Sequence, residues 1–265
     1  MGCVSALGHS VEAFWSAMQD GTCGLRKLDL PAPLDLKVTV AGAIPAPDPR
    51  EKIDGRRSPM LDRFSVLALV AAQQAIAQSG LTLSKGGLRT GCMVGVGTAG
   101  AETIDEMYQK IFLGGAKRAN VFTVPRVMPS APASQISMAY GIRGPVFTVS
   151  SACASSNHAI ATAVWLLRSG IIDAAVVGGT EAPLTYGLLK AWEALRVLAP
   201  DTCRPFDRNR KGLVLAEGAG MFVLERAEHA RARGVKVLAQ IADVGMSADA
   251  ADLVSSTLEG PAAAI

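Results

Sequence analysis

Aromatic residues are scarce in this sequence: Phe, Trp and Tyr together make up 5% of its 265 residues. Large rings therefore cannot fill most of its interior. The sequence is nevertheless 49% hydrophobic and rich in Ala, Gly and Val, which is enough apolar material for a substantial core. Small side chains suit close packing of helices on a sheet. The composition excludes disordered and fibrous classes and indicates an α/β protein.

An excess of one charge is also lacking. Lys and Arg number 26 against 23 Asp and Glu, a formal net charge of +3, and the basic residues are dispersed among acids. Nucleic-acid binding needs a dense basic surface, so no nucleic-acid partner is expected. No run approaches the ~18 consecutive apolar residues of a membrane-spanning helix. The N-terminus has no basic segment followed by a long apolar core, so we expect no membrane association.

Paired cysteines are missing as well. The five cysteines are odd in number, widely spaced and form no Cys-x-x-Cys pair. This pattern argues against a disulfide scaffold and against a zinc site. It fits a reducing compartment, and we expect a cytoplasmic protein.

Cys153 occupies the most informative position in the chain. It follows an apolar strand predicted at residues 146–150 and precedes a helix predicted from about Ala154 to Leu167. A thiol at the start of a helix lies near unpaired backbone N–H groups and the positive end of the helix dipole, which favours the nucleophilic thiolate. Its Ala and Ser neighbours leave room for a substrate carbonyl. A buried, inert cysteine is the ordinary alternative.

Two competing sites are weaker. Residues 95–100 read GVGTAG, a formal dinucleotide fingerprint, but residues 116–122 lack the acidic residue that would hold the ribose. We interpret the glycines as letting the backbone approach a neighbouring chain or a substrate. A serine hydrolase would carry Gly-x-Ser-x-Gly at this turn, and the serines around Cys153 lack those glycines.

No histidine is well placed to serve Cys153. His158 is five residues further along the predicted helix, which is about 140° round the axis from the sulfur. We therefore interpret His158 as a packing or capping residue and not as the base. His9 and His229 lie in amphipathic surface contexts.

The hydrophobic pattern also predicts the other elements. Helices are expected at residues 10–20, 61–79, 101–112, 130–140, 185–195 and 227–233, and strands at 90–96, 174–177, 213–215, 221–224 and 236–244. The glycine-rich residues 217–220 are expected to form a hairpin or bulge between two of these strands. Continuous apolar strands separated by helices predict a mostly parallel sheet covered on both faces.

Five motifs occur in series: LDRF at 61–64, YGIRGP at 140–145, VSSACASSNH at 149–158, VGGTE at 177–181, and RPFD with KGLVLAEGAG at 204–220. In order and spacing they resemble the β-ketoacyl-acyl-carrier-protein synthases, condensing enzymes of the thiolase-like superfamily. The resemblance covers nearly the whole chain. The Ser-Ser-Ala-Cys form is similar to the elongating type, which takes both substrates from acyl carrier protein.

The resemblance implies a thiolase-like layered fold (αβαβα), of which this chain is the N-terminal half. Cys153 would take the acyl chain from a carrier-protein thioester, and its backbone N–H would be one of two oxyanion donors. Malonyl-carrier protein would lose carbon dioxide, and the resulting carbanion would attack the acyl thioester. No cofactor or metal is implied. The family's homodimer would form through the strand at 146–150.

Five further residues match family positions. Thr98 falls at the gate of the acyl pocket and Trp192 at an aromatic position lining it, although both also fit ordinary loop or core packing. Lys117, Arg118 and Arg196 match basic positions that meet the acidic carrier protein, although surface bases are often merely solvated.

The sequence also departs from the family. The family's catalytic histidines, and the loop that supplies the second oxyanion donor, fall beyond its last residue. The opening Met-Gly matches an internal pair that normally follows the first core strand. We therefore expect residues 1–247 to be the N-terminal domain without its first strand, and 248–265 to begin a linker or C-terminal domain. Lys211, Pro59 and Met60 also differ from the usual residues.

The sequence thus predicts an acyltransferase of fatty acid biosynthesis that is acylated on Cys153 but condenses little on its own. Two alternatives stay open: a polyketide ketosynthase, and a non-catalytic remnant or partner subunit that binds carrier protein.

Overall fold

The computed structural model describes residues 1–28, 35–83, 87–252 and 255–265. Its centre is a five-stranded sheet, with a separate two-stranded ribbon beside it. The order across the main sheet is β1 (Gly2–Ser5), β7 (Gly218–Glu225), β6 (Ala174–Glu181), β4 (Thr90–Gly95) and β5 (Val146–Val149). The ribbon pairs β2 (Arg26–Lys27) with β3 (Val40–Ala41).

The main sheet is mostly parallel, as predicted. β4 pairs in parallel with both β5 and β6. β7 is antiparallel to β6 and to β1, so β1 runs in the same direction as β6 and β7 alone is reversed. The central strands β4 and β6 are buried almost throughout, which explains why their sequences are apolar without alternation.

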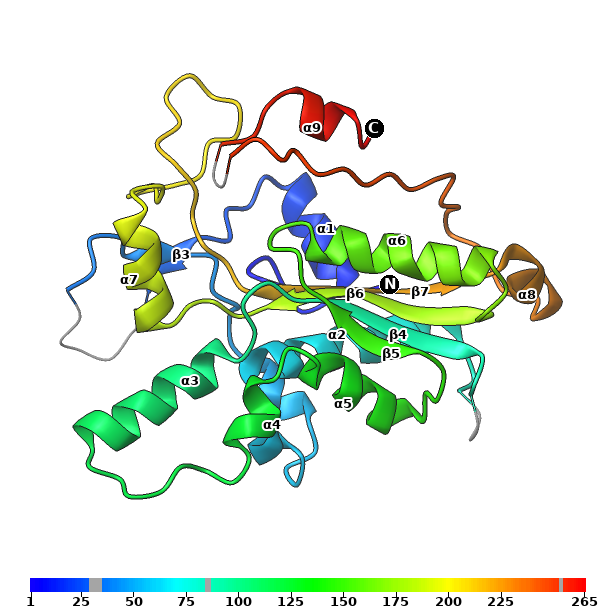
Figure 1. Ribbon diagram of the computed structural model, residues 1–265, viewed down its shortest axis with the longest axis horizontal. Helices are drawn as coiled ribbons and strands as arrows, with labels where there is room; N and C mark the ends of the chain where they lie inside the picture. Colours follow the sequence, from blue (N-terminus) through cyan, green and yellow to red (C-terminus); the bar gives the residue numbers. More distant parts are fainter. Residues whose placement is uncertain (29–34, 84–86, 253–254) are drawn as a thin grey trace.

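Helices cover both faces of this sheet (Figure 1). α6 (Ser155–Arg168) lies on one face, and α2 (Arg63–Ser79) and α5 (Ala131–Tyr140) lie on the other. The limits of α2 follow from its caps: the Asp62 carboxylate accepts a hydrogen bond from Phe64 N, and Gly80 ends the helix in the left-handed conformation. The three helices predicted here, at 61–79, at 130–140 and from about Ala154 to Leu167, are therefore confirmed, and together they cover both faces of the sheet.

Small residues let α6 approach the sheet closely. Ala159 and Ala163 are fully buried in one cluster with Met93 of β4 and Val177 of β6. A second cluster, beneath the opposite face, joins α2 and α5 to the same strands. The close packing of a helix on the sheet that the composition predicts is therefore present, with alanines and not aromatic rings at this contact.

The remaining helices lie around the sheet. They are α1 (Val11–Gln19), α3 (Ala101–Tyr108), α4 (Thr123–Val127), α7 (Tyr186–Ala194), α8 (Ala227–Ala232) and α9 (Glu259–Ala262), with 3-10 turns η1 (Pro49–Lys52) and η2 (Ser58–Met60). α3 continues into a π-helical turn, η3 (Gln109–Leu113), so the single helix predicted to residue 112 changes its hydrogen bonding at Gln109. α3 and α4 extend away from the sheet (Figure 1).

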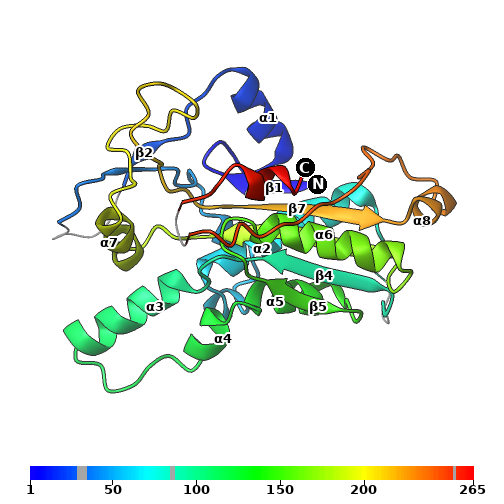
Figure 2. The same cartoon turned by 45° about the horizontal axis from the view of Figure 1, so that its top comes forward.

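Two strand predictions were wrong. Residues 213–220 do not form a hairpin: Leu213 makes only an isolated bridge to Leu198, and the glycines begin β7. There Gly220 lies opposite Gly179 of β6. Residues 236–244, predicted as a strand, find no ladder partner in the described part of the chain. Figure 2 shows this tail crossing in front of α6 without joining the sheet.

Among the helices of the described residues, none has the length and apolar character needed to cross a lipid bilayer.

Candidate active site

Cys153 lies in the turn between β5 and α6, at the carboxyl end of the parallel strands. Its side chain is exposed, and in the described part of the chain it makes no hydrogen bond or ion pair. α6 begins two residues later, and its N-cap residue Ala154 provides no side-chain bond to the first turn. The positive end of the α6 dipole therefore lies close to Cys153.

The turn that carries the thiol is conformationally strained. Ala152, immediately before Cys153, has φ of 50°, a left-handed conformation that costs a residue with a Cβ about 1–2 kcal/mol. Ser155 stabilises this turn from within. Its hydroxyl is buried, donates to Ala152 O at 2.6 Å and accepts from Ser151 N at 2.8 Å. A strained residue held by its surroundings beside a nucleophile is typical of a functional turn.

The GVGTAG loop after β4 lies beside this turn, and its glycines are explained by close approach. A Cβ on Gly95 would lie 2.4 Å from the carbonyl carbon of Ser155, and one on Gly100 would lie 2.4 Å from Val127 Cα. The loop is held by Glu181, at the end of β6, whose Oε2 accepts from Gly97 N at 2.7 Å and from Thr98 N at 2.8 Å. Gly95 and Gly100 therefore pack against other segments of their own chain. The approach to a neighbouring chain or a substrate stays a prediction.

Substituting Gly95 by alanine tests this packing. The added Cβ would meet the backbone of the first turn of α6, which cannot move away as a flexible side chain could. We expect a loss of about 3 kcal/mol in the free energy of unfolding, seen as a fall of about 6–12 °C in melting temperature. Gly220→Ala is the control, because a Cβ there has nothing within 4 Å. Equal melting temperatures for the two variants would contradict the packing argument.

The other residues selected from the sequence lie on segments other than the turn between β5 and α6. Thr98 is exposed in the Glu181-bound loop, and Trp192 is partly buried on α7. Lys117 and Arg118 are exposed between η3 and α4, and Arg196 is exposed just after α7. These bases come from two segments, and no recorded hydrogen bond or ion pair in the described part of the chain joins them to each other.

Each histidine has its own partner, and none is hydrogen-bonded to Cys153. His158 Nδ1 lies 2.7 Å from Ser151 Oγ. His9 Nε2 lies 2.9 Å from Pro45 O, and His229 Nδ1 lies 2.7 Å from Glu225 Oε1. The described residues therefore place no imidazole on the sulfur of Cys153.

The cysteines differ sharply in exposure. Cys92 in β4 is buried, and its burial raises the pKa of the thiol to about 12. Burial also raises the pKa of the Cys3 thiol, with a smaller opposing contribution from a Ser5 hydrogen bond. Cys23, Cys153 and Cys203 are exposed. Of these three, Cys153 alone lies in the turn between β5 and α6.

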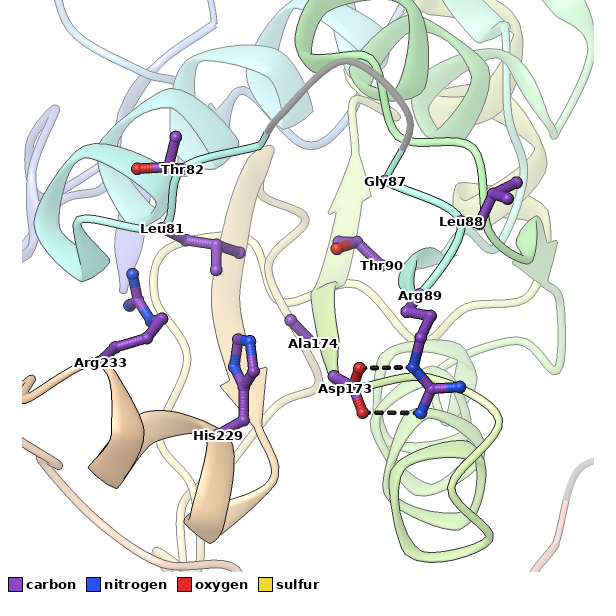
Figure 3. A pocket seen from close by; sticks show the side chains of 10 residues that line it. All are labelled: Leu81, Thr82, Gly87, Leu88, Arg89, Thr90, Asp173, Ala174, His229 and Arg233. Atoms are coloured by element: carbon purple, nitrogen blue, oxygen red, sulfur yellow. Dashed lines mark hydrogen bonds and ion pairs between the residues drawn. The ribbon is translucent and has the colours of Figure 1, made fainter.

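A separate cavity of about 540 Å³ lies at the opposite end of the strands from Cys153, where β4 and β6 begin (Figure 3). Its charged side chains are already paired. Arg89 Nε and Nη2 donate to Asp173 at 2.5 and 2.7 Å, and Arg233 donates to Glu225 and to the last carbonyls of α2. These pairs connect the ends of strands and helices, and they leave Cys153 as the stronger candidate for chemistry.

Two residues of the site were missed by the sequence analysis. Glu181 was noted only as part of a motif, and Ser155 only as a small neighbour. The sequence did contain a signal for Glu181. This acidic residue ends a buried strand, and the glycine loop follows the neighbouring parallel strand, so both lie at the carboxyl ends of the strands. Ser155 had no comparable signal, because its role depends on the φ of Ala152.

Comparison with known proteins gives a consistent result. Residues 1–230 match the family model of the β-ketoacyl synthase N-terminal domain. The chain is 48% identical over 266 residues to nodulation protein E of Rhizobium leguminosarum bv. trifolii, covering 100% of this chain and 66% of that protein. It is 32% identical to 3-oxoacyl-acyl-carrier-protein synthase 2 of Staphylococcus aureus, covering 98% of this chain and 66% of that protein.

A solved structure has the same fold. The ishigamide ketosynthase/chain length factor superposes with a TM-score of 0.93 at 27% identity, covering 99% of this chain and 66% of that one. The chain thus spans 66% of the length of these three relatives.

Proposed function

The chain belongs to the β-ketoacyl synthase family, and from this premise we propose that Cys153 accepts an acyl group from acyl carrier protein for carbon–carbon bond formation. The sulfur attacks the carbonyl of the acyl thioester, the bond from that carbonyl to the carrier's sulfur breaks, and the carrier leaves as a thiol. Malonyl-carrier protein then loses carbon dioxide. Its carbanion attacks the acyl-Cys153 carbonyl and releases the thiolate, in a decarboxylative condensation of fatty acid biosynthesis.

The observation that carries this proposal is the exposed sulfur in a strained turn at the start of α6. Its exposure admits a substrate, and the small side chains of Ala152 and Ala154 leave the approach open. The backbone N–H of Cys153 is our candidate for one oxyanion donor. The sequence match includes this turn, which lies within residues 1–230.

We propose that other residues of the chain bind the acyl chain and the carrier protein. We assign Thr98 to the entrance of the acyl pocket and Trp192 to its lining, since Thr98 lies in the loop held by Glu181 and Trp192 is partly buried. We assign Lys117, Arg118 and Arg196 to contacts with carrier protein, because their exposed cationic side chains suit an acidic partner. The Staphylococcus relative is named as a synthase of 3-oxoacyl-acyl-carrier protein.

We also propose that β5 pairs with a second chain of the same kind. β5 is an edge of the main sheet, and Phe147 on it is 36% exposed. An edge strand offers unpaired N–H and C=O groups to a partner strand. Pairing β5 with its twofold copy would continue the sheet into a homodimer.

Acyl loading tests the function. When the chain is mixed with an acyl thioester of acyl carrier protein, its intact mass should rise by one acyl group and free carrier thiol should appear in equal amount. Denatured chain is the control and should gain nothing, because only the folded turn presents the sulfur beside α6. A folded chain that stays unmodified by acyl carrier protein would overturn the proposal.

A polyketide ketosynthase is the second candidate. It is favoured by the likeness to a ketosynthase solved in complex with a type II PKS acyl-carrier protein, which superposes with a TM-score of 0.82 at 27% identity and covers 94% of this chain and 62% of that one. The two candidates differ in the acyl group that loads fastest from the carrier: a saturated chain for fatty acid synthesis, or a β-ketoacyl chain for polyketide synthesis. Loading rates measured with one donor of each kind separate them.

A further inference from the structure

His158 is connected to the nucleophile turn through a serine. Its Nδ1 lies 2.7 Å from Ser151 Oγ, and Ser151 is two residues before Cys153. Both side chains are partly buried, so water competes for this hydrogen bond less than at an exposed site. His158 thus contacts the turn from the side of α6 and leaves the sulfur itself free.

The turn depends on such contacts because Ala152 is in a left-handed conformation. A non-glycine residue adopts this conformation stably only when its surroundings hold it there. Ser155 holds the inner side of the turn through Ala152 O and Ser151 N. The Ser151 hydroxyl makes a separate hydrogen bond, to the His158 imidazole.

His158 is itself firmly placed on α6. Its backbone N–H donates to Ala154 O at 2.9 Å, and its carbonyl accepts from Thr162 Oγ1 at 2.7 Å. The imidazole therefore links the end of β5 to a fixed point one turn into α6. This link and the Ser155 hydroxyl hold the turn from two sides.

We propose that His158 is a positioning residue: by holding Ser151, it fixes the direction of the Cys153 thiol toward the substrate. It transfers no proton to or from the sulfur. The proposal rests on the proposed function of Cys153. It gives the His158 imidazole a role that is exerted through Ser151 and not on the sulfur directly.

The test measures the alkylation rate of each cysteine by iodoacetamide in wild type and His158→Ala, using peptide mass spectrometry. Losing one hydrogen bond should misplace the thiol and slow Cys153 about three- to tenfold. Cys203 is exposed in the irregular segment between α7 and β7 and serves as an internal control, whose rate should not change. Buried Cys92 should stay unmodified, which shows that the variant is folded.

A conservative variant separates positioning from general packing. An asparagine side chain carries an amide that can bond Ser151 in place of the imidazole Nδ1, so His158→Asn should restore most of the Cys153 rate. In the double variant Ser151→Ala/His158→Ala, the loss should equal that of either single variant, because both remove the same bond.

Three outcomes would overturn the proposal: an unchanged Cys153 rate in His158→Ala, equal slowing of Cys203, or losses that multiply in the double variant. These outcomes are independent of the proposed function. Iodoacetamide reports the placement of the thiol whether or not acyl carrier protein is the donor, whereas acyl loading of the wild-type chain tests the donor.

Discussion

Replacing Glu217 by leucine should lower the free energy of unfolding by about 3–5 kcal/mol, because it removes the closest ion-pair partner of the largely buried Arg63 and leaves the guanidinium with the longer contact to Asp48 Oδ1, at 3.3 Å. Glu217 is 7% exposed, and its carboxylate receives Arg63 Nε at 2.5 Å and Arg63 Nη2 at 2.7 Å. The hydrogen bond to Glu217 raises the pKa of Arg63 above its ordinary value. The arginine stays charged in the variant even without this bond, because a guanidinium group does not lose its proton in proteins. Ile44 N also donates to this carboxylate, at 3.0 Å, and would lose its acceptor. Urea unfolding measures the change.

Asp243→Leu is the matched control. Asp243 receives Arg168 Nη1 at 2.8 Å, but its side chain is 82% exposed, so we expect a change of no more than about 1 kcal/mol. In the double variant Arg63→Met/Glu217→Leu, much of the lost stability should return, because the buried charge that has lost Glu217 is gone as well. A Glu217→Leu variant as mild as Asp243→Leu would show that the Arg63 and Glu217 pair does not stabilise the fold.

Replacing Cys153 by alanine should reduce acyl transfer to the chain by about 10³-fold or more, to the background of the other thiols. The substitution removes the attacking atom from an exposed position, so the melting temperature should change little. The measurement is the initial rate at which free carrier thiol is released, compared between the wild type and the variant.

The control for this variant is Cys203→Ala. Cys203 is also exposed, but it lies in the irregular segment between α7 and β7, with no helix starting beside it. Its removal should leave the acyl-transfer rate unchanged. If Cys203→Ala abolishes transfer and Cys153→Ala does not, the nucleophile has been assigned to the wrong residue.

Much of the scaffold around Cys153 follows from local signals. The run of apolar residues at β4 and β6, the Asp62 and Gly80 caps of α2, and the strand-to-helix change at Cys153 are all visible in the sequence. These features depend on neighbours within a few residues, so periodicity and capping rules find them.

The features that were missed or wrongly predicted depend on distant parts of the chain. The strand pattern at residues 236–244 meets no partner strand in the described part of the chain, and a strand forms only when a neighbour accepts its hydrogen bonds. Gly218 and Gly220 read as a turn, whereas the pairing with β6 makes them strand residues. The helical angle separated His158 from Cys153 correctly, but the bond to Ser151 also requires the turn at Ala152, which helical geometry does not describe.

The central claim is that the sulfur between β5 and α6 carries the acyl group. The most direct measurement is a peptide mass map of the chain after loading from acyl carrier protein, without reducing agent and at a pH that preserves thioesters. The account predicts the added mass on the peptide that contains Cys153, removable by hydroxylamine. Acylation found on Cys23 or Cys203, with the Cys153 peptide unmodified, would contradict it.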